Sequence, residues 1–160
     1  LVGEPGRGLA LALGRITVNR LLHCPAMVGL AAVALRDACE YAGRRRQFGR
    51  AIGKFQAIQH QLSVMAEHVF AARMAAQMGC TAGDAPTLAP DALRVAVAKA
   101  RTSEAALEVA ALSHSIHGAI GFTAEFDLQV YTRRLHAWRQ AAGAESHWHD
   151  RIGTLSLIHI

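Results

Sequence analysis

Apolar side chains recur every three or four positions along most of this chain, a period that predicts amphipathic helices rather than strands. The predicted helices cover residues 9–41, 55–78, 92–116, 123–140 and, as a short last element, 145–152. Asp91 and Thr123 are the predicted N-caps of the third and fourth helices, and Pro25 should interrupt or kink the first. The short connections favour an all-α fold, an up-down four-helix bundle.

The same period predicts which residues face the core. In the first helix it runs through Ile16, Leu21, Val28, Val33 and Leu35. The third helix is expected to turn inward the residues Leu93, Val97, Ala100, Leu107 and Leu112.

The composition agrees with a globular helical domain. Apolar residues make up 52% of the 160 residues and charged residues 18%, which is typical of neither disordered nor membrane proteins. Uncharged runs are shorter than the ~20 residues that a membrane-spanning helix needs, so we expect no membrane span. Cys24, Cys39 and Cys80 are odd in number and widely spaced, which predicts free thiols in a reducing compartment. The basic residues are almost all arginine, which favours a GC-rich bacterial source, and together with the reducing compartment this gives the expectation of a bacterial cytoplasmic protein.

The net charge of +5 favours an anionic partner, such as nucleic acid, an anionic membrane or a phosphate-bearing small molecule. The densest basic cluster is Arg44-Arg45-Arg46-Gln47-Phe48-Gly49-Arg50. Guanidinium groups bind phosphate in forked pairs, and Phe48 could cover a flat ring. A solvated basic turn and a nucleic-acid contact remain open as interpretations of this cluster, although no second basic patch with aromatic residues accompanies it.

A second cluster, His117-Gly118-Ala119-Ile120-Gly121-Phe122-Thr123-Ala124-Glu125, joins two predicted helices. Its small residues would let a ligand approach the backbone, and an ordinary turn between helices is the alternative. His114 and His117 are spaced for one helix face, but no third ligand has suitable spacing. We therefore expect packed or surface histidines and no metal.

The order of these parts resembles the acyl-CoA dehydrogenase family. A long helix is followed by R-x-x-F-G-x-x-I-x-x-F-Q from Arg45, then by a second long helix and by H-G-x-I-G-F-T-x-E from His117. The resemblance implies that residues 9–153 form the C-terminal helical-bundle domain and that residues 1–8 end a middle β domain. Residues 154–160 look like the translation of a sequencing adapter and are expected to be non-native.

The resemblance also implies a function. Family members bind FAD, form homo- or hetero-oligomers that share the FAD site across subunits, and oxidise acyl-CoA thioesters between the α and β carbons. An electron-transfer flavoprotein is the expected electron acceptor. Arg20 matches a position that contacts the CoA moiety. The residues that match FAD contacts are Arg45, Gln47, Phe48, Ile52, Phe55, Gln56, Ser115, His117, Gly118 and Ala119.

The expected catalytic carboxylate is missing from both positions where the family places it, which are occupied by Ala142 and Asn19. A methyl group and a neutral amide cannot remove a proton as a carboxylate does. Glu145 and Glu125 are weak candidates for a displaced base. Three hypotheses follow: a complete enzyme with a displaced carboxylate, a subunit without a base in a heteromeric enzyme, or a non-enzymatic helical module that binds an anion such as nucleic acid through residues 44–50.

Overall fold

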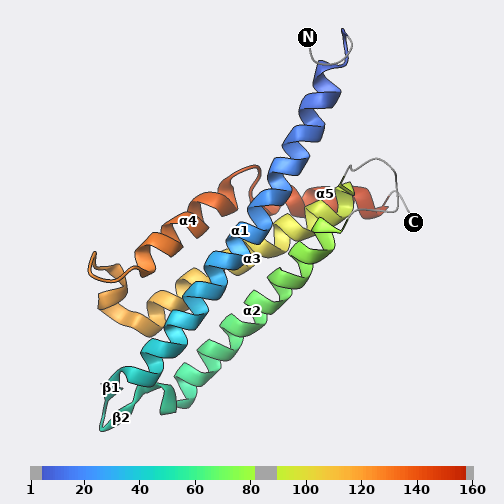
Figure 1. The fold of residues 1–160 in the computed structure, drawn as a ribbon. Coiled ribbons are helices and arrows are strands. Elements are labelled where there is room, and N and C mark those ends of the chain that lie inside the picture. The colour runs from blue at the N-terminus through green and yellow to red at the C-terminus, as the bar shows by residue number, and fades with distance from the viewer. Residues whose placement is uncertain (1–4, 82–89, 158–160) are drawn as a thin grey trace.

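Five α-helices account for most of the chain, and the longest three run side by side (Figure 1). The computed structural model describes residues 5–81 and 90–157. In chain order the elements are α1 (Gly8–Arg44), β1 (Arg46–Gln47), β2 (Arg50–Ala51), the 3-10 helix η1 (Ile52–Lys54), α2 (Gln56–Cys80), α3 (Ala92–His117), the 3-10 helix η2 (Gly118–Phe122), α4 (Leu128–Gln140) and α5 (Glu145–Leu157). The predicted all-α fold is confirmed, with one small hairpin added.

Helix α3 is the centre of the bundle, because it packs against each of the other four helices. Its neighbours α1 and α2 also pack against each other, while α4 lies on the side of α1 and α3 away from α2 (Figure 1). α5 crosses the end of the bundle where α4 ends. This arrangement buries residues on nearly every side of α3.

Small side chains, rather than the large apolar ones, form much of the helix-to-helix contact. The buried face of α1 consists of Cys24, Met27, Ala31, Ala34, Ala38 and Ala42, which follow one another at three- and four-residue steps. Alanine allows two helix backbones to approach closely. The expectation that Ile16 and Leu107 belong to the core is wrong, since 43% and 37% of their surfaces are exposed.

The basic cluster forms a two-residue β-hairpin. Arg46 pairs with Ala51 and Gln47 with Arg50 in the antiparallel register, and Phe48 and Gly49 form the turn. Both turn residues have positive φ, 53° and 79°, as the tight turn of a hairpin requires. The hairpin is therefore an ordered element where the sequence predicted only a basic turn.

The structure confirms some of the predicted helix caps and boundaries and corrects others. The Asp91 carboxylate accepts a hydrogen bond from the Arg94 amide at 2.7 Å, as predicted for an N-cap. Thr123 does not cap α4, because its hydroxyl donates to the Ile120 carbonyl and α4 begins five residues later, at Leu128. Pro25 lies inside α1 without interrupting it. The last helix continues past residue 152 to Leu157, through part of the predicted tail.

Helix α1 is long and apolar enough to cross a membrane by length and composition alone. Core helices pass the same test, and the second half of α1 packs into the bundle through its alanine face. The first turns of α1 extend beyond the other helices (Figure 1), and 74% of the Leu9 surface is exposed.

The bundle has two ends that matter for function. The hairpin end contains the hairpin, which follows α1, and the junction of α3 with η2, where Tyr41 of α1 stacks on His117 of α3. The turn end contains residues 15–24 of α1 and the turn between α4 and α5. Along α1 the two ends are about 40 Å apart, from Asn19 to Arg45, at 1.5 Å per helical residue.

Candidate functional site

A pocket of about 220 Å³ at the turn end brings together the two positions predicted for the catalytic base. Arg15, Ile16 and Asn19 line it from α1, and Ala142 lines it from the turn between α4 and α5. No carboxylate is present among the described lining residues. The two positions lie far apart in the sequence, yet they face one cavity and neither offers a proton acceptor of useful strength.

The backbone at Ala142 is unusual. Its φ is 63° and that of Gly143 is 112°, so two consecutive residues have a left-handed backbone. A residue with a Cβ adopts this conformation at a cost of about 1–2 kcal/mol and keeps it only where its surroundings impose it. Ala142 is thus held at the pocket wall by contacts outside itself.

Arg20, the residue predicted to contact the CoA moiety, lies one position beyond Asn19 on α1. Its guanidinium carbon lies 5.1 Å from the centroid of the Trp148 ring, a cation–π contact that fixes the side chain against α5. Arg20 Nε is buried and has no hydrogen-bond partner among the described residues. Burial of an unpaired donor is costly, and Arg20 does not line the pocket in this structure.

Glu145 is poorly suited to act as a displaced base. Its carboxylate accepts hydrogen bonds from Arg139 Nε at 2.6 Å and from Arg139 Nη2 at 3.3 Å. The Arg139 guanidinium holds the pKa of Glu145 below its usual range. A carboxylate that is already paired and has a lowered pKa is a weak proton acceptor. It also does not line the pocket.

Glu125 lies at the hairpin end, in the exposed segment between η2 and α4. The whole of α4 separates it from Ala142, a distance of about 20 Å for 13 helical residues. The structure therefore does not bring Glu125 to the pocket, and neither candidate for a displaced base lies there.

The hairpin presents an unusual combination of arginine and aromatic side chains. Phe48 is 90% exposed at the tip, and its ring meets the Phe55 ring edge-on at 6.1 Å. The Arg50 guanidinium carbon lies 4.1 Å from the centroid of Phe55. Within the described part of the chain, no ion pair engages Arg45, Arg46 or Arg50, so these guanidinium groups are available to an anion.

The hairpin is held firmly at its base. The Arg45 amide donates to the Tyr41 carbonyl at 2.8 Å, and the Ile52 amide donates to the Arg45 carbonyl at 2.8 Å. Ile52 also packs against the core, and Gln56 begins α2 directly behind the hairpin. The predicted cofactor residues of this segment thus belong to one rigid projection.

The glycine-rich junction contributes to the same end of the molecule. Ser115 Oγ accepts a hydrogen bond from Gln61 Nε2 at 3.2 Å, which ties α3 to α2 behind the hairpin. Gly118 has a φ of 66°, and both Gly118 and Ala119 are exposed. His117 as a whole is only 3% exposed, so a ligand on this surface would meet Gly118 and Ala119 rather than His117.

His114 and His117 are packed, as one of the two interpretations predicted. His117 Nδ1 bonds the Ser113 carbonyl at 2.7 Å, and its ring lies against Tyr41 and Phe126. His114 stacks on Phe122 at 4.3 Å. Burial lowers the pKa of both histidines, which favours their neutral forms.

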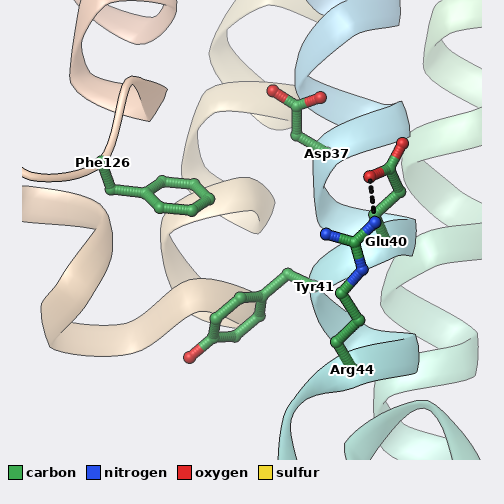
Figure 2. A pocket seen from close by; sticks show the side chains of 5 residues that line it. All are labelled: Asp37, Glu40, Tyr41, Arg44 and Phe126. Atoms are coloured by element: carbon green, nitrogen blue, oxygen red, sulfur yellow. Dashed lines mark ion pairs between the residues drawn. The ribbon is translucent and has the colours of Figure 1, made fainter.

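Two features were missed from the sequence. One is a pocket of about 210 Å³ beside the hairpin end (Figure 2), lined by Asp37, Glu40, Tyr41, Arg44 and Phe126. The Arg44 guanidinium is paired there with Glu40 at 3.3 Å, which separates Arg44 from the free arginines of the hairpin. The other is Lys99, which is fully buried beneath the turn that carries Ala142. In the sequence, the only indication of this buried residue is that Lys99 is the one charged residue in the apolar segment 95–100.

Comparison with known proteins gives a consistent picture. Residues 6–153 match the family model described as acyl-CoA dehydrogenase, C-terminal domain. Glutaryl-CoA dehydrogenase of Desulfococcus multivorans is 34% identical over 144 residues, which cover 90% of this chain and 37% of that protein. The chain thus spans little more than a third of that relative's length.

Solved structures agree with the sequence comparison. The structure of a glutaryl-coenzyme A dehydrogenase glutaryl-CoA complex has a TM-score of 0.91 and 33% identity, with 97% of this chain and 39% of that chain covered. One chain of the ChsE4-ChsE5 complex from Mycobacterium tuberculosis has a TM-score of 0.80 and 25% identity, with 87% and 37% covered.

Proposed function

This chain belongs to the acyl-CoA dehydrogenase family, as the C-terminal domain of its members, and we propose that it comes from a subunit that lacks the catalytic base. In this proposal the subunit belongs to a heteromeric, FAD-dependent dehydrogenase of acyl-CoA thioesters. Its hairpin end completes an FAD site, while its own pocket at the turn end does not catalyse proton removal. The pocket lined by both Asn19 and Ala142 is the observation that carries the proposal.

The hairpin end has the chemistry that FAD requires. A diphosphate is recognised by guanidinium groups that are free of ion pairs, and Arg45 has none with the residues that the structure describes. The exposed ring of Phe48 offers an apolar surface for the adenine. The exposed backbone of Gly118 and Ala119 would complete the contact. When bound, FAD supplies the hydride acceptor for the oxidation of the acyl group.

The separation of the two ends supports an FAD site that is shared between subunits. About 40 Å of helix lies between Asn19 and Arg45, more than one dinucleotide can span. A flavin whose ring lies at this chain's pocket therefore cannot also reach this chain's hairpin. In this proposal the hairpin therefore serves a flavin whose ring lies in another subunit of an oligomer.

A heteromeric assembly fits the missing base better than a homomeric one. In a homo-oligomer every pocket would lack the carboxylate, whereas a partner subunit with an intact base could catalyse the reaction on a flavin that this chain helps to hold. The similarity to a chain of the ChsE4-ChsE5 complex supports this choice. An electron-transfer flavoprotein as electron acceptor and a cytoplasmic location, compatible with three free cysteines, complete the proposal.

The decisive experiment restores the missing carboxylate. In the full-length protein that carries this domain, prepared without its partner as an FAD-loaded homo-oligomer, Ala142→Glu should raise the rate of flavin reduction by acyl-CoA in a single turnover. General-base catalysis is typically worth about 10²–10⁴-fold, so the gain should be at least about a hundred-fold with a matching acyl chain. A panel of acyl-CoA thioesters of different length covers the unknown substrate.

The matched controls are Glu145→Gln and Glu125→Gln, which remove the two other candidate carboxylates. Both should leave flavin reduction unchanged. Vigorous turnover by the unmodified protein alone that disappears in either control would show a displaced base, and the subunit would then be a self-sufficient enzyme. The alternative of a module that binds nucleic acid through residues 44–50 has no support in the comparisons and is not proposed.

A further inference from the structure

Lys99 lies in the middle of α3, and none of its surface is exposed. Burial of an ammonium group is costly unless hydrogen bonds replace the lost water. Burial also lowers the pKa of Lys99. The adjacent residues Ala98 and Ala100 offer no polar side-chain atom, so the groups that hold this charge must come largely from another element.

The Lys99 ammonium bonds both sides of the turn between α4 and α5. The three N–H groups of Nζ are shared among four oxygens, the carbonyls of Arg139 at 2.9 Å, Trp138 at 3.4 Å and Gly143 at 3.3 Å and Ser103 Oγ at 2.9 Å. Carbonyls in the last turn of a helix lack the usual amide partner, and a positive charge is favoured there. One side chain thus satisfies the end of α4 and fastens it to Gly143.

The same turn has a second anchor on α5. Trp148 Nε1 donates to the Gly143 carbonyl at 3.1 Å, so this oxygen accepts from both Lys99 and Trp148. The indole packs so closely that a Cβ at position 143 would lie 2.8 Å from Trp148 Nε1. Between these two anchors Ala142 keeps its left-handed backbone, which needs such support to persist.

Lys99 itself does not line the pocket, whereas Ala142, adjacent to Gly143, does. We propose that Lys99 is the positioning residue of this pocket: by fastening the end of α4 to Gly143, its ammonium holds residue 142 at the pocket wall. The inference deepens the proposed function and rests on it for the identity of the ligand. In the Ala142→Glu variant, the same bonds would aim the introduced carboxylate at the substrate.

The first test examines the turn without any substrate. In the full-length protein, Lys99→Met should speed amide hydrogen exchange across residues 138–148 by about ten- to a hundred-fold, because charge-assisted hydrogen bonds are lost. In an Ala142→Cys background, Lys99→Met should change by about ten-fold the rate at which iodoacetamide alkylates the introduced thiol. Peptide mass spectrometry measures this rate. Arg94→Met, an exposed change on the same helix, is the matched control and should alter neither rate.

If Lys99 only stabilised the fold in general, its replacement would speed amide exchange equally in segments far from the turn. An equal rise in exchange in the hairpin, residues 45–52, including outright unfolding, would overturn the proposal, as would unchanged exchange in the turn. Lys99→Gln keeps a shorter amide donor and should recover part of the protection. This milder variant preserves the comparison if Lys99→Met unfolds.

The second test connects the turn to the reaction. In the Ala142→Glu background, Lys99→Met should lower the rate of flavin reduction about ten-fold or more while FAD retention, which depends on the hairpin end, is unchanged. A turn that loosens without any loss of flavin reduction would overturn the proposal. If Ala142→Glu gains no activity at all, that failure counts against the proposed function, and the first test alone decides the role of Lys99.

Discussion

At the scale of single residues, Glu145 shows how local pairing decides whether a carboxylate can act as a base. Arg139 bonds both carboxylate oxygens, and each side chain of the pair is 19% exposed. A pair of this kind stabilises the ionised carboxylate, and it lowers the pKa of Glu145 for the same reason. The contact that makes Glu145 useful for stability therefore makes it unsuitable for proton removal.

This pairing predicts a pH-dependent contribution to stability. Because the pKa of Glu145 is lower in the folded than in the unfolded protein, the contribution is complete above the unfolded value of about 4.3 and is lost as pH falls through the folded value. Glu145→Gln should cost about 1 kcal/mol at pH 7, and the difference should shrink at pH 3. Urea denaturation of both proteins at each pH measures it, with the exposed Glu108→Gln as control. A difference that stays constant with pH would contradict the pairing.

At the scale of elements, the hairpin converts a run of arginines into groups with distinct surroundings. Arg44 belongs to α1 and is paired with Glu40, whereas Arg45 begins the hairpin and is free of ion pairs among the described residues. Arg46 lies directly opposite Ala51 and Gln47 opposite Arg50. Side chains of successive residues in a strand point to opposite faces, so Arg46 faces away from Gln47 and Arg50.

These differences predict unequal effects on cofactor binding. In the full-length protein, Arg45→Ala should weaken FAD retention about ten- to a hundred-fold, because a charge-assisted hydrogen bond to phosphate is lost. Arg44→Ala and Arg46→Ala should have much smaller effects, since Arg44 is paired with Glu40 and only Arg45 has the register, three residues before Phe48, that the family resemblance assigns to the phosphate contact. Dialysis against FAD-free buffer followed by flavin absorbance measures the retention. Equal losses in all three variants would indicate a diffuse basic patch instead of one positioned group.

The helices were predictable from periodicity, but the residues that make them pack were less so. Apolar recurrence does not distinguish a large side chain that points to solvent, such as Ile16, from an alanine face that brings two helices together, such as Ala31 and Ala34. The hairpin was hidden because a left-handed phenylalanine, Phe48, is rare. Thr123 carried the right residue type for a cap but lies five residues before α4 begins.

At the scale of the whole molecule, the sequence predicted both clusters of candidate residues but not their separation. The motifs at Arg45 and His117 lie at the same end of the bundle because α1 and α3 pack side by side, as the Tyr41–His117 stack shows. Asn19 and Ala142 meet at the other end for a similar reason, because α1 and α4 pack together. Lys99 escaped prediction because a lone lysine on a helix is normally a surface residue, and only the packed structure reveals the carbonyl groups around it.

This separation predicts that the 160-residue chain alone does not hold FAD tightly. The hairpin end offers contacts for the diphosphate and the adenine only, and its aromatic ring Phe48 is 90% exposed. A few such contacts barely exceed the cost of immobilising a ligand. Titration of the isolated chain with FAD, followed by flavin fluorescence, should give a dissociation constant weaker than about 1 μM. Submicromolar binding that Arg45→Ala abolishes would show a self-contained site at the hairpin end and would remove the argument for a flavin shared between subunits.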